Sequence, residues 1–121
     1  MIDGIINVYK EQNYTSFDVV AKLRGILKQK KIGHTGTLDP MAEGVLLVCL
    51  GKATKLVDLL TEGNKCYRAT MKLGYETDTE DVTGEKTVEG DSAVISGLTE
   101  ETICKAILSF VGKYDQIPPM Y

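Results

Sequence analysis

The sequence predicts an α+β fold, with a mixed, largely antiparallel sheet and flanking helices. Two short apolar runs, Gly4–Lys10 and residues 45–50, have the length and composition of strands. Two other segments repeat apolar residues at the three- and four-residue spacing of a helix. Strands and helices follow one another without a strict βαβ alternation, so the pattern favours α+β over a doubly wound parallel sheet.

The first half of the chain contains four predicted elements. Gly4–Lys10 is short and β-branched, which indicates a strand. Thr15 or Ser16 is then expected to cap a helix whose apolar face carries Phe17, Val20, Leu23 and Leu27. Gly33 and Gly36 mark a loop around His34. Residues 45–50, VLLVCL, lie between glycines and predict a strand that is buried on both faces.

The second half is more polar and its elements are shorter. Residues 53–60 predict a short helix that ends before Gly63, and residues 67–74 alternate as a half-buried strand does. Residues 76–91 are acidic and rich in Thr and Gly, which indicates a mobile hairpin or loop. Thr99 is expected to cap a helix with the apolar residues Ile103, Ala106, Ile107 and Phe110. The tail 116–121 holds two prolines and is expected to be extended.

Length and composition exclude several classes of protein. A chain of 121 residues suits one domain, and its three widely spaced cysteines form neither a disulfide framework nor a C-x-x-C motif. No apolar run approaches the ~20 residues that span a bilayer. The first ten residues lack the positive charge of a secretory signal. We therefore expect a cytoplasmic protein without membrane attachment.

The charge of the chain is unevenly distributed. The net charge is −3, but residues 1–72 hold 11 Lys and Arg against 7 Asp and Glu, whereas residues 73–121 hold 3 against 10. Five cations fall within ten residues and are candidates for contacts with a phosphate backbone, namely Lys22, Arg24, Lys28, Lys30 and Lys31. The alternative is an ordinary solvated helix face.

Residues 32–55 concentrate the chemical information, and common catalytic motifs are absent from them. The sequence has no phosphate-binding glycine loop, no dinucleotide fingerprint and no G-x-S-x-G elbow. One histidine without clustered cysteines does not make a zinc site. Residues 33–36, GHTG, match the GXXG loop of KH domains by letter, which is a weak signal without the flanking helices.

What remains is a histidine and a carboxylate, His34 and Asp39, in a glycine-rich segment before the predicted buried strand. Gly33, Gly36 and Gly44 indicate that the backbone passes close to another group, and the strand would hold the segment rigidly. The alternative for Asp39 is the N-cap of a helix with proline at its first position. The alternative for His34 is an ordinary loop residue.

The segments GHTGTLDP at 33–40 and GVLLVCLGKATK at 44–55 closely resemble the signature of the TruB family of tRNA pseudouridine synthases. The resemblance continues through KCYR at 65–68, Leu73-Gly74, TDT at 77–79 with Asp81, and QIPPMY at 116–121. Near the N-terminus Lys10, Thr15 and Ser16 match the first family motif. Glu11 replaces its proline and Asn13 replaces its glycine, and asparagine tolerates the left-handed conformation that such a turn needs.

This resemblance implies a function and a set of site residues. Asp39 is implied to be the catalytic aspartate that isomerises uridine 55 in the T-loop of tRNA, a reaction that requires no cofactor. Tyr67 is implied to stack on the uracil and His34 to enter the T-loop, with Gly33, Gly36 and Lys10 as further substrate contacts. The residues alone favour the alternative that Tyr67 is a strand aromatic packed in the core.

The resemblance also implies that residues 1–121 are the N-terminal portion of a catalytic domain, without the C-terminal PUA domain of many members. The family's K-G-x-Y-x-R segment, whose arginine pairs with the aspartate, is not among these residues. We therefore expect the 121-residue chain to be inactive alone and to self-associate, and we expect no obligatory protein partner for the full enzyme. The alternatives are a non-catalytic RNA-binding module and a guide-RNA-dependent relative of the dyskerin type.

Overall fold

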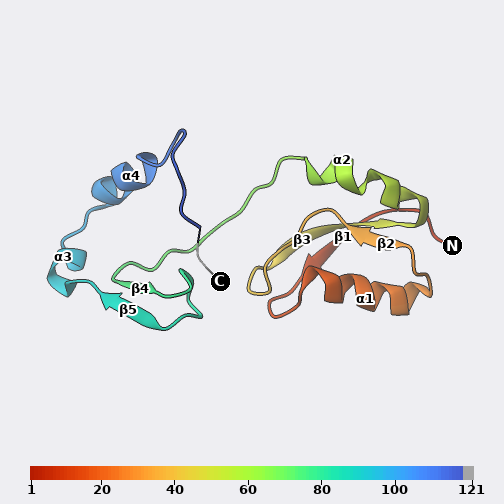
Figure 1. Ribbon diagram of the computed structural model, residues 1–121, viewed down its shortest axis with the longest axis horizontal. Coiled ribbons are helices and arrows are strands. Elements are labelled where there is room, and N and C mark those ends of the chain that lie inside the picture. The colour runs from red at the N-terminus through yellow and green to blue at the C-terminus, as the bar shows by residue number, and fades with distance from the viewer. Residues whose placement is uncertain (119–121) are drawn as a thin grey trace. The chain divides into compact units, whose positions relative to one another are not determined.

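The computed structural model describes residues 1–118 and divides the chain into two compact units, Met1–Cys66 and a second that begins at Tyr67 (Figure 1). The first contains β1 (Gly4–Lys10), α1 (Ser16–Leu27), β2 (Ile32–His34), β3 (Gly44–Leu50), the 3₁₀ helix η1 (Gly51–Leu56) and α2 (Val57–Thr61). The second contains β4 (Tyr75–Thr77), β5 (Lys86–Glu89), α3 (Ser92–Ser96) and α4 (Glu100–Leu108). Residues 119–121 of the predicted extended tail lie outside the described residues.

The sheet of the first unit has β3 at its centre, with β1 and β2 as its edges. Both pairings are antiparallel, and β1 pairs along its whole length, from Gly4 opposite Leu50 to Lys10 opposite Gly44. β2 pairs over three residues, ending with His34 opposite Val48. The predicted α+β class is confirmed. The sheet was predicted to be mixed and largely antiparallel, and every strand pairing in the described residues is antiparallel.

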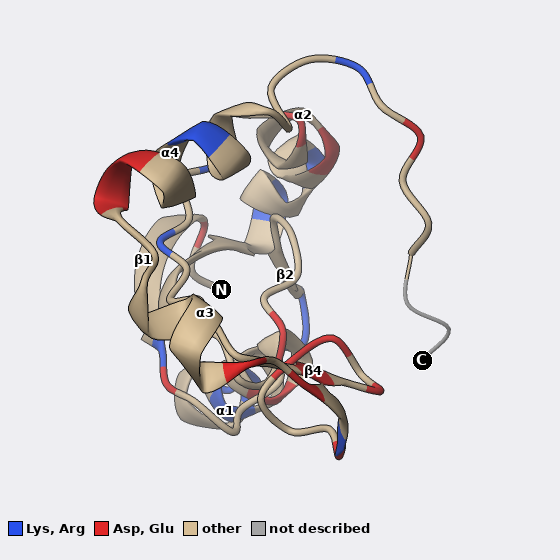
Figure 2. Ribbon diagram, turned by 90° about the vertical axis from the view of Figure 1, so that its left-hand side faces the viewer, with Lys and Arg blue, Asp and Glu red and all other residues tan. Residues whose placement is uncertain are grey.

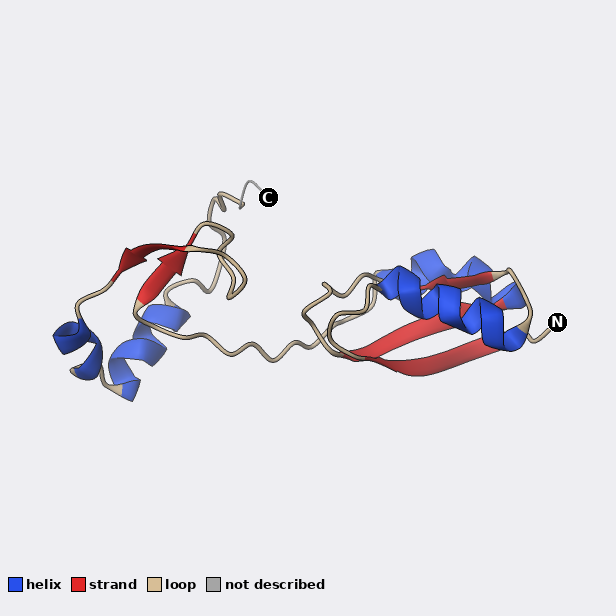
Figure 3. Cartoon of the chain, turned by 90° about the horizontal axis from the view of Figure 1, so that it is seen from below, coloured by secondary structure: helices blue, strands red, loops and turns tan. Residues whose placement is uncertain are grey.

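Helix α1 covers one face of this sheet and forms the core with it (Figure 3). Val19 and Val20 of the helix are buried against Ile32, Leu46, Val48 and Leu50 of the strands. Burial of each such side chain contributes about 1.5–3 kcal/mol. Of the two predicted caps, Thr15 and Ser16, the cap is Thr15, whose hydroxyl accepts a hydrogen bond from the amide of Asp18. The predicted face was wrong for Phe17, which is 62% exposed because the buried stripe begins one residue earlier, at Ser16.

The opposite face of the sheet is covered by η1 and α2 (Figures 1 and 3). A Cβ added at Gly33 would lie 3.4 Å from the side chain of Val57, so the helix passes close to β2 there. The helix predicted over residues 53–60 is therefore present, but its first part is 3₁₀. β3 is buried from Val48 to Leu50, whereas Val45 at its beginning is 68% exposed, so burial on both faces holds only for the second half of the strand.

Gly51 joins β3 to η1 in a conformation that requires glycine. Its φ is +56°, and a Cβ at this position would lie 2.7 Å from the carbonyl oxygen of Ile2 and would also clash with the Asp3 carboxylate. That carboxylate accepts a 2.7 Å hydrogen bond from the amide of Lys52. The amide of Gly51 donates to the carbonyl of Lys31 at 2.8 Å. The junction thus holds the N-terminus, the end of β3 and the residue before β2 together.

Replacing Gly51 by alanine is expected to reduce the free energy of unfolding of the first unit by about 2 kcal/mol, because a left-handed alanine costs 1–2 kcal/mol before any clash. Urea denaturation followed by circular dichroism measures the change. Gly25→Ala is the matched control: Gly25 lies within α1 with open space around its Cα, so alanine should stabilise by about 0.5–1 kcal/mol. Equal effects of the two substitutions on the free energy of unfolding would contradict the conclusion that the backbone at Gly51 requires glycine.

The second unit begins with an extended segment and an antiparallel hairpin of β4 and β5. The hairpin predicted within residues 76–91 is confirmed. Its loop is built around Asp81, whose carboxylate accepts hydrogen bonds from the hydroxyl and amide of Thr83 and from the hydroxyl of Thr79. These bonds, the one from the Thr83 hydroxyl first, hold the pKa of Asp81 below its usual range. Their contribution to stability is therefore present at neutral pH and is lost as the pH falls through that lowered pKa.

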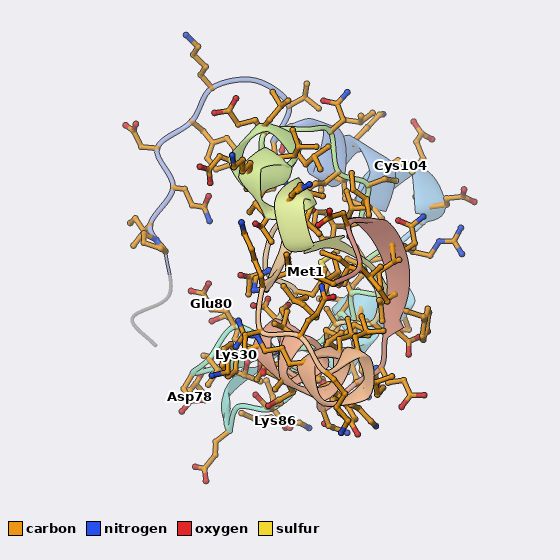
Figure 4. The ribbon with its side chains drawn as sticks, turned by 90° about the vertical axis from the view of Figure 1, so that its right-hand side faces the viewer. Met1, Lys30, Asp78, Glu80, Lys86 and Cys104 are labelled. Atoms are coloured by element: carbon orange, nitrogen blue, oxygen red, sulfur yellow. The ribbon has the colours of Figure 1, made fainter. Side chains whose placement is uncertain are left out.

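The same loop fixes Asp78 and Gly84. The Asp78 carboxylate accepts a 2.9 Å hydrogen bond from the amide of Glu85, and a Cβ at Gly84 would clash with the side chains of Asp78 and Thr79. Asp78 and Glu80 are labelled in Figure 4. The T-D-T-x-D segment is thus an ordered turn whose carboxylates bind the loop itself.

Two predictions in the second unit need correction. Residues 67–73 are extended but form no strand, because no described strand pairs with them. α3 was not predicted; Asp91 caps it through the amide of Ala93. α4 begins as predicted after Thr99, with the acidic residues of its first turn in red in Figure 2. The helix ends at Leu108, so Phe110 lies beyond it. Of the predicted apolar face only Ile103 is half-buried, and the other three residues are exposed.

None of the helices in residues 1–118 is long and apolar enough to cross a membrane.

A candidate active-site turn at Asp39

Asp39 occupies the first position of a β-turn that precedes β3. Its carbonyl accepts a 2.9 Å hydrogen bond from the amide of Ala42, and Pro40 takes the second position, where its fixed φ is favoured. No helix follows, so the alternative of a helix cap is wrong. The side chain of Asp39 is exposed, and within residues 1–118 its carboxylate has no hydrogen bond or ion pair. The turn therefore presents a carboxylate to solvent.

The side chain of Lys10 binds the backbone of this turn from the interior of the first unit. Lys10 is completely buried, and its ammonium group donates hydrogen bonds to the carbonyls of Glu11 at 3.0 Å, Tyr14 at 2.7 Å and Pro40 at 3.4 Å. An ammonium group has three donors, so all of them are used by backbone oxygens. Lys10 was expected to contact substrate, but in this position it ties the turn of Asp39 to the segment between β1 and α1.

Asn13 makes a second connection to the same carbonyl. Its backbone amide donates to the oxygen of Pro40 at 2.7 Å, and its φ is +66°. The left-handed conformation expected where Asn13 replaces the family's glycine is therefore present. The carbonyl just after Asp39 is held by two donors from another part of the chain.

On the other side of Asp39, the backbone of Leu38 is held by Ser16. The Leu38 amide donates to the Ser16 hydroxyl oxygen at 2.9 Å, and the hydroxyl donates to the Leu38 carbonyl at 3.3 Å. Ser16 is only 1% exposed, and Leu38 packs its side chain against the core. Both neighbours of Asp39 are thus fixed through their backbones, whereas the Asp39 side chain is left unengaged.

His34 is the last residue of β2, where a loop had been predicted. Its Nδ1 lies 2.6 Å from the carbonyl oxygen of Gly36, which can only accept, so Nδ1 carries the proton and Nε2 of the neutral ring is an acceptor. The amide of Thr35 continues the pairing of β2 with β3 by donating a 3.0 Å hydrogen bond to the carbonyl oxygen of Leu47. Gly36 has a φ of +118°, which favours glycine there. β2 runs toward the end of the sheet at which Lys10 pairs with Gly44, but His34 lies opposite Val48, so the segment from Thr35 to Glu43 leads from the middle of β3 to the Asp39 turn and the beginning of that strand.

The five predicted phosphate contacts differ in their surroundings. Arg24 is half-buried and donates from Nη2 to the carbonyl of Ile32 at 3.2 Å, and its guanidinium lies over the ring of Phe17. Its Nε is buried with no hydrogen-bond partner in the described part of the chain. Lys22 places its ammonium group 5.3 Å from the centre of the Tyr14 ring. Arg24 thus binds the protein itself, whereas Lys22 is exposed beside Tyr14.

Lys28, Lys30 and Lys31 are exposed at the opposite end of the first unit from Asp39. Lys31 is bonded to Gly51 at the end of β3, whereas the Asp39 turn precedes the first residue of that strand. The seven residues of β3 span roughly 20 Å at 3.3 Å per residue. A ligand bound at Asp39 must be long to reach these lysines as well.

Tyr67 is the first residue of the second unit and is 66% exposed. The alternative of a tyrosine packed in the core is therefore wrong. Asp39 and Tyr67 belong to different units, and the structure describes each unit by itself. Within residues 1–118, no three His, Cys, Asp or Glu side chains are grouped so that they could hold a metal ion.

Comparison with known families gives a match over most of the chain. Residues 24–121 match the model of the TruB family pseudouridylate synthase N-terminal domain. The chain is 55% identical over 120 residues to a tRNA pseudouridine synthase B of Clostridium perfringens strain 13, covering 99% of this chain and 40% of the relative. It is 52% identical to a tRNA pseudouridine synthase B of Lactococcus lactis subsp. cremoris strain MG1363, covering 99% of this chain and 36% of the relative.

A solved structure supports the same relationship. A chain of the crystal structure of a Cbf5-Nop10-Gar1 complex matches 97% of this chain and 29% of its own length, with a TM-score of 0.62 and 31% identity. The chain thus spans 40% or less of the length of these relatives. The family match includes His34, Asp39 and Tyr67, whereas Lys10 and Ser16 precede it. With a family model matched over residues 24–121, the chain belongs to the TruB family of pseudouridylate synthases.

Proposed function

We propose that the protein containing this chain is a tRNA pseudouridine synthase that converts uridine 55 of the T-loop to pseudouridine, with Asp39 as its catalytic residue. The observation that carries the proposal is the exposed Asp39 carboxylate on a turn whose backbone is held on both sides, by Ser16 and by Lys10. The names of the relatives, each a tRNA pseudouridine synthase B at 52–55% identity, support tRNA as the substrate.

The proposed reaction is an isomerisation, so atoms and electrons balance within the nucleoside. The bond from ribose C1′ to uracil N1 breaks, the uracil turns, and a bond from C1′ to C5 forms. N1 gains a proton and C5 loses one. A carboxylate suits this reaction because it can act as nucleophile or base and can stabilise positive charge that develops on the ribose. The reaction needs no oxidant, reductant or group donor, and the proposal includes no cofactor.

The remaining site residues take supporting roles in this proposal. Tyr67 offers its exposed ring for stacking on the uracil, which is worth ~1–3 kcal/mol per base. His34 offers Nε2 as an acceptor to the T-loop. Gly33 and Gly36 are candidate contacts through their backbones only, because a Cβ at either position would lie 3.4 Å from a side chain of the first unit, Val57 or Lys65. Lys10 acts by holding the turn. Lys22 is the candidate phosphate contact beside Tyr14, and Lys28, Lys30 and Lys31 are candidates for phosphates further along the RNA.

The proposal also assigns residues 1–121 to the N-terminal portion of a catalytic domain. The relatives are more than twice as long as this chain. We expect the arginine partner of Asp39 and any PUA domain to lie in the remainder of the protein, and we expect residues 1–121 alone to be inactive. An unpaired carboxylate is less well oriented in a closed site. A cytoplasmic location is part of the proposal.

The experiment that tests this function uses the product of the complete reading frame and an unmodified tRNA transcript. Pseudouridine is detected by carbodiimide labelling and primer extension, and the expected result is a single stop immediately 3′ of position 55. A transcript with cytidine at that position is the control and should give no stop. Purified protein and tRNA alone should suffice for product formation. A guide-RNA-dependent relative would instead give no product until a guide RNA is added.

Two outcomes would overturn the proposal. Tight binding of the T-stem-loop without any pseudouridine would identify a non-catalytic RNA-binding module. Modification at another uridine would retain the enzyme class but reject the T-loop as its substrate.

A further inference from the structure

We propose that Ser16 is a positioning residue for Asp39, an inference that rests on the proposed function. The Ser16 hydroxyl is the one side-chain group bonded to the backbone of Leu38, the residue before Asp39, in the described part of the chain. It binds both polar groups of that residue, the amide at 2.9 Å and the carbonyl at 3.3 Å. Ser16 is 22 residues away in sequence and 1% exposed, so the contact is a fixed tertiary one.

The hydroxyl is not needed to begin helix α1. Thr15 caps the helix by accepting a hydrogen bond from the amide of Asp18, and the Asp18 carboxylate accepts one from the amide of Thr15, which completes a capping box. A serine at the first helical position could therefore point to solvent or be replaced by alanine without loss of the cap. Instead its donor and acceptor are both used by Leu38.

This contact restricts the orientation of the chain at Asp39. The Leu38 carbonyl belongs to the peptide unit that also contains the Asp39 amide, so the hydroxyl limits the rotation of that peptide plane. Lys10 and Asn13 hold the carbonyl of Pro40 on the other side. Without the Ser16 hydroxyl, the Asp39 carboxylate is chemically unchanged but samples more positions. A displacement of about 1 Å can cost 10²-fold in rate.

The effect should fall on kcat rather than on KM, because Ser16 is buried and touches no substrate. Ser16→Ala in the product of the complete reading frame is expected to lower kcat by about 10–100-fold, with KM within about threefold of wild type. Assays are run where circular dichroism shows each variant to be folded.

Thr15→Ala is the matched control. It removes the cap at the adjacent residue and destabilises the same end of α1, but Thr15 makes no hydrogen bond to residues 35–42 in the described structure. Its kcat should stay within about twofold of wild type. Ser16→Cys keeps the size of the side chain but replaces the hydroxyl with a weakly bonding thiol, so it should lower kcat in the same direction even if Ser16→Ala does not fold.

A second readout does not depend on activity. Amide hydrogen exchange at Leu38 should accelerate about tenfold or more in Ser16→Ala or Ser16→Cys relative to wild type, whereas Val48 in the central strand should exchange unchanged. Equal kcat values for the Ser16 and Thr15 variants, or an unchanged Leu38 exchange rate, would overturn the inference. Wild-type protein without pseudouridine formation would instead overturn the proposed function, and the Leu38 exchange rates would still test the contact.

Discussion

Asp39→Asn is expected to lower kcat of the full protein by at least about 10³-fold while changing the free energy of unfolding by no more than about 0.5 kcal/mol. The loss of rate follows from the chemistry, since an amide can neither act as a nucleophile or base nor stabilise positive charge at the ribose. The small effect on stability follows from the geometry. Asparagine is as favourable as aspartate at the first position of a β-turn, and the turn is held through backbone groups.

This combination distinguishes a catalytic carboxylate from a structural one. Rates are measured on an unmodified tRNA transcript, and stability by urea denaturation of the same preparations. Glu43→Gln is the matched control, because Glu43 is another exposed carboxylate in the segment between Asp39 and β3. Its kcat should remain within about threefold of wild type. A large loss of stability in Asp39→Asn, or equal activity of the two variants, would contradict the assignment of Asp39.

The parts of the fold with local sequence signals could be predicted from the sequence. β1 has the predicted bounds, because a run of β-branched residues between a glycine and a polar turn leaves few alternatives. The caps were predicted at Thr99 and at either Thr15 or Ser16, since the hydroxyl of a cap bonds to an amide only three residues away, and the structure has Thr99 and Thr15. The left-handed Asn13 was also expected from its residue type.

The parts that depend on distant partners could not be predicted. Residues 67–73 alternate as a strand does, but a strand requires a partner, and none of the described strands supplies one. The five cations are close in sequence but differ in their surroundings, because α1 turns Arg24 toward the protein and leaves Lys22 exposed, and the other three lysines follow its last residue. Phe17 looked like a core residue by composition, yet the buried stripe of α1 runs from Ser16 through Val19 and Val20.

The candidate site shows the same division. Asp39 and His34 were identified from the family signature, but the groups that hold their segment were not. Ser16 and Leu38 are 22 residues apart, and Lys10 and Pro40 are 30 apart. A serine beside a capping threonine is expected to be a cap, and a lysine is expected to be exposed. The structure places both side chains in the interior because each satisfies backbone groups of a turn that has no regular secondary structure of its own.

The role of Lys10 leads to the second large expected effect. Lys10→Met should reduce the free energy of unfolding of the first unit by about 3 kcal/mol, because hydrogen bonds to a charged group contribute about 1.5–3 kcal/mol each and unsatisfied buried acceptors cost more. Methionine fills the space of the stem but donates nothing to the carbonyls of Glu11, Tyr14 and Pro40. The Pro40 carbonyl keeps its bond from Asn13, so the loss falls mainly on the other two.

Lys10→Arg distinguishes the effect of the positive charge from the effect of the ammonium group's size and donor arrangement. A guanidinium keeps the charge but is planar and larger, so it cannot place three donors on one nitrogen among these carbonyls. We expect it to recover less than half of the loss in a completely buried position. Lys55→Met, at an exposed lysine of η1, is the control and should stay within about 0.5 kcal/mol of wild type. If Lys10→Met were as stable as this control, the ammonium group would not be what holds the Asp39 turn, and the position of the turn would have to come from Ser16 and Asn13 alone.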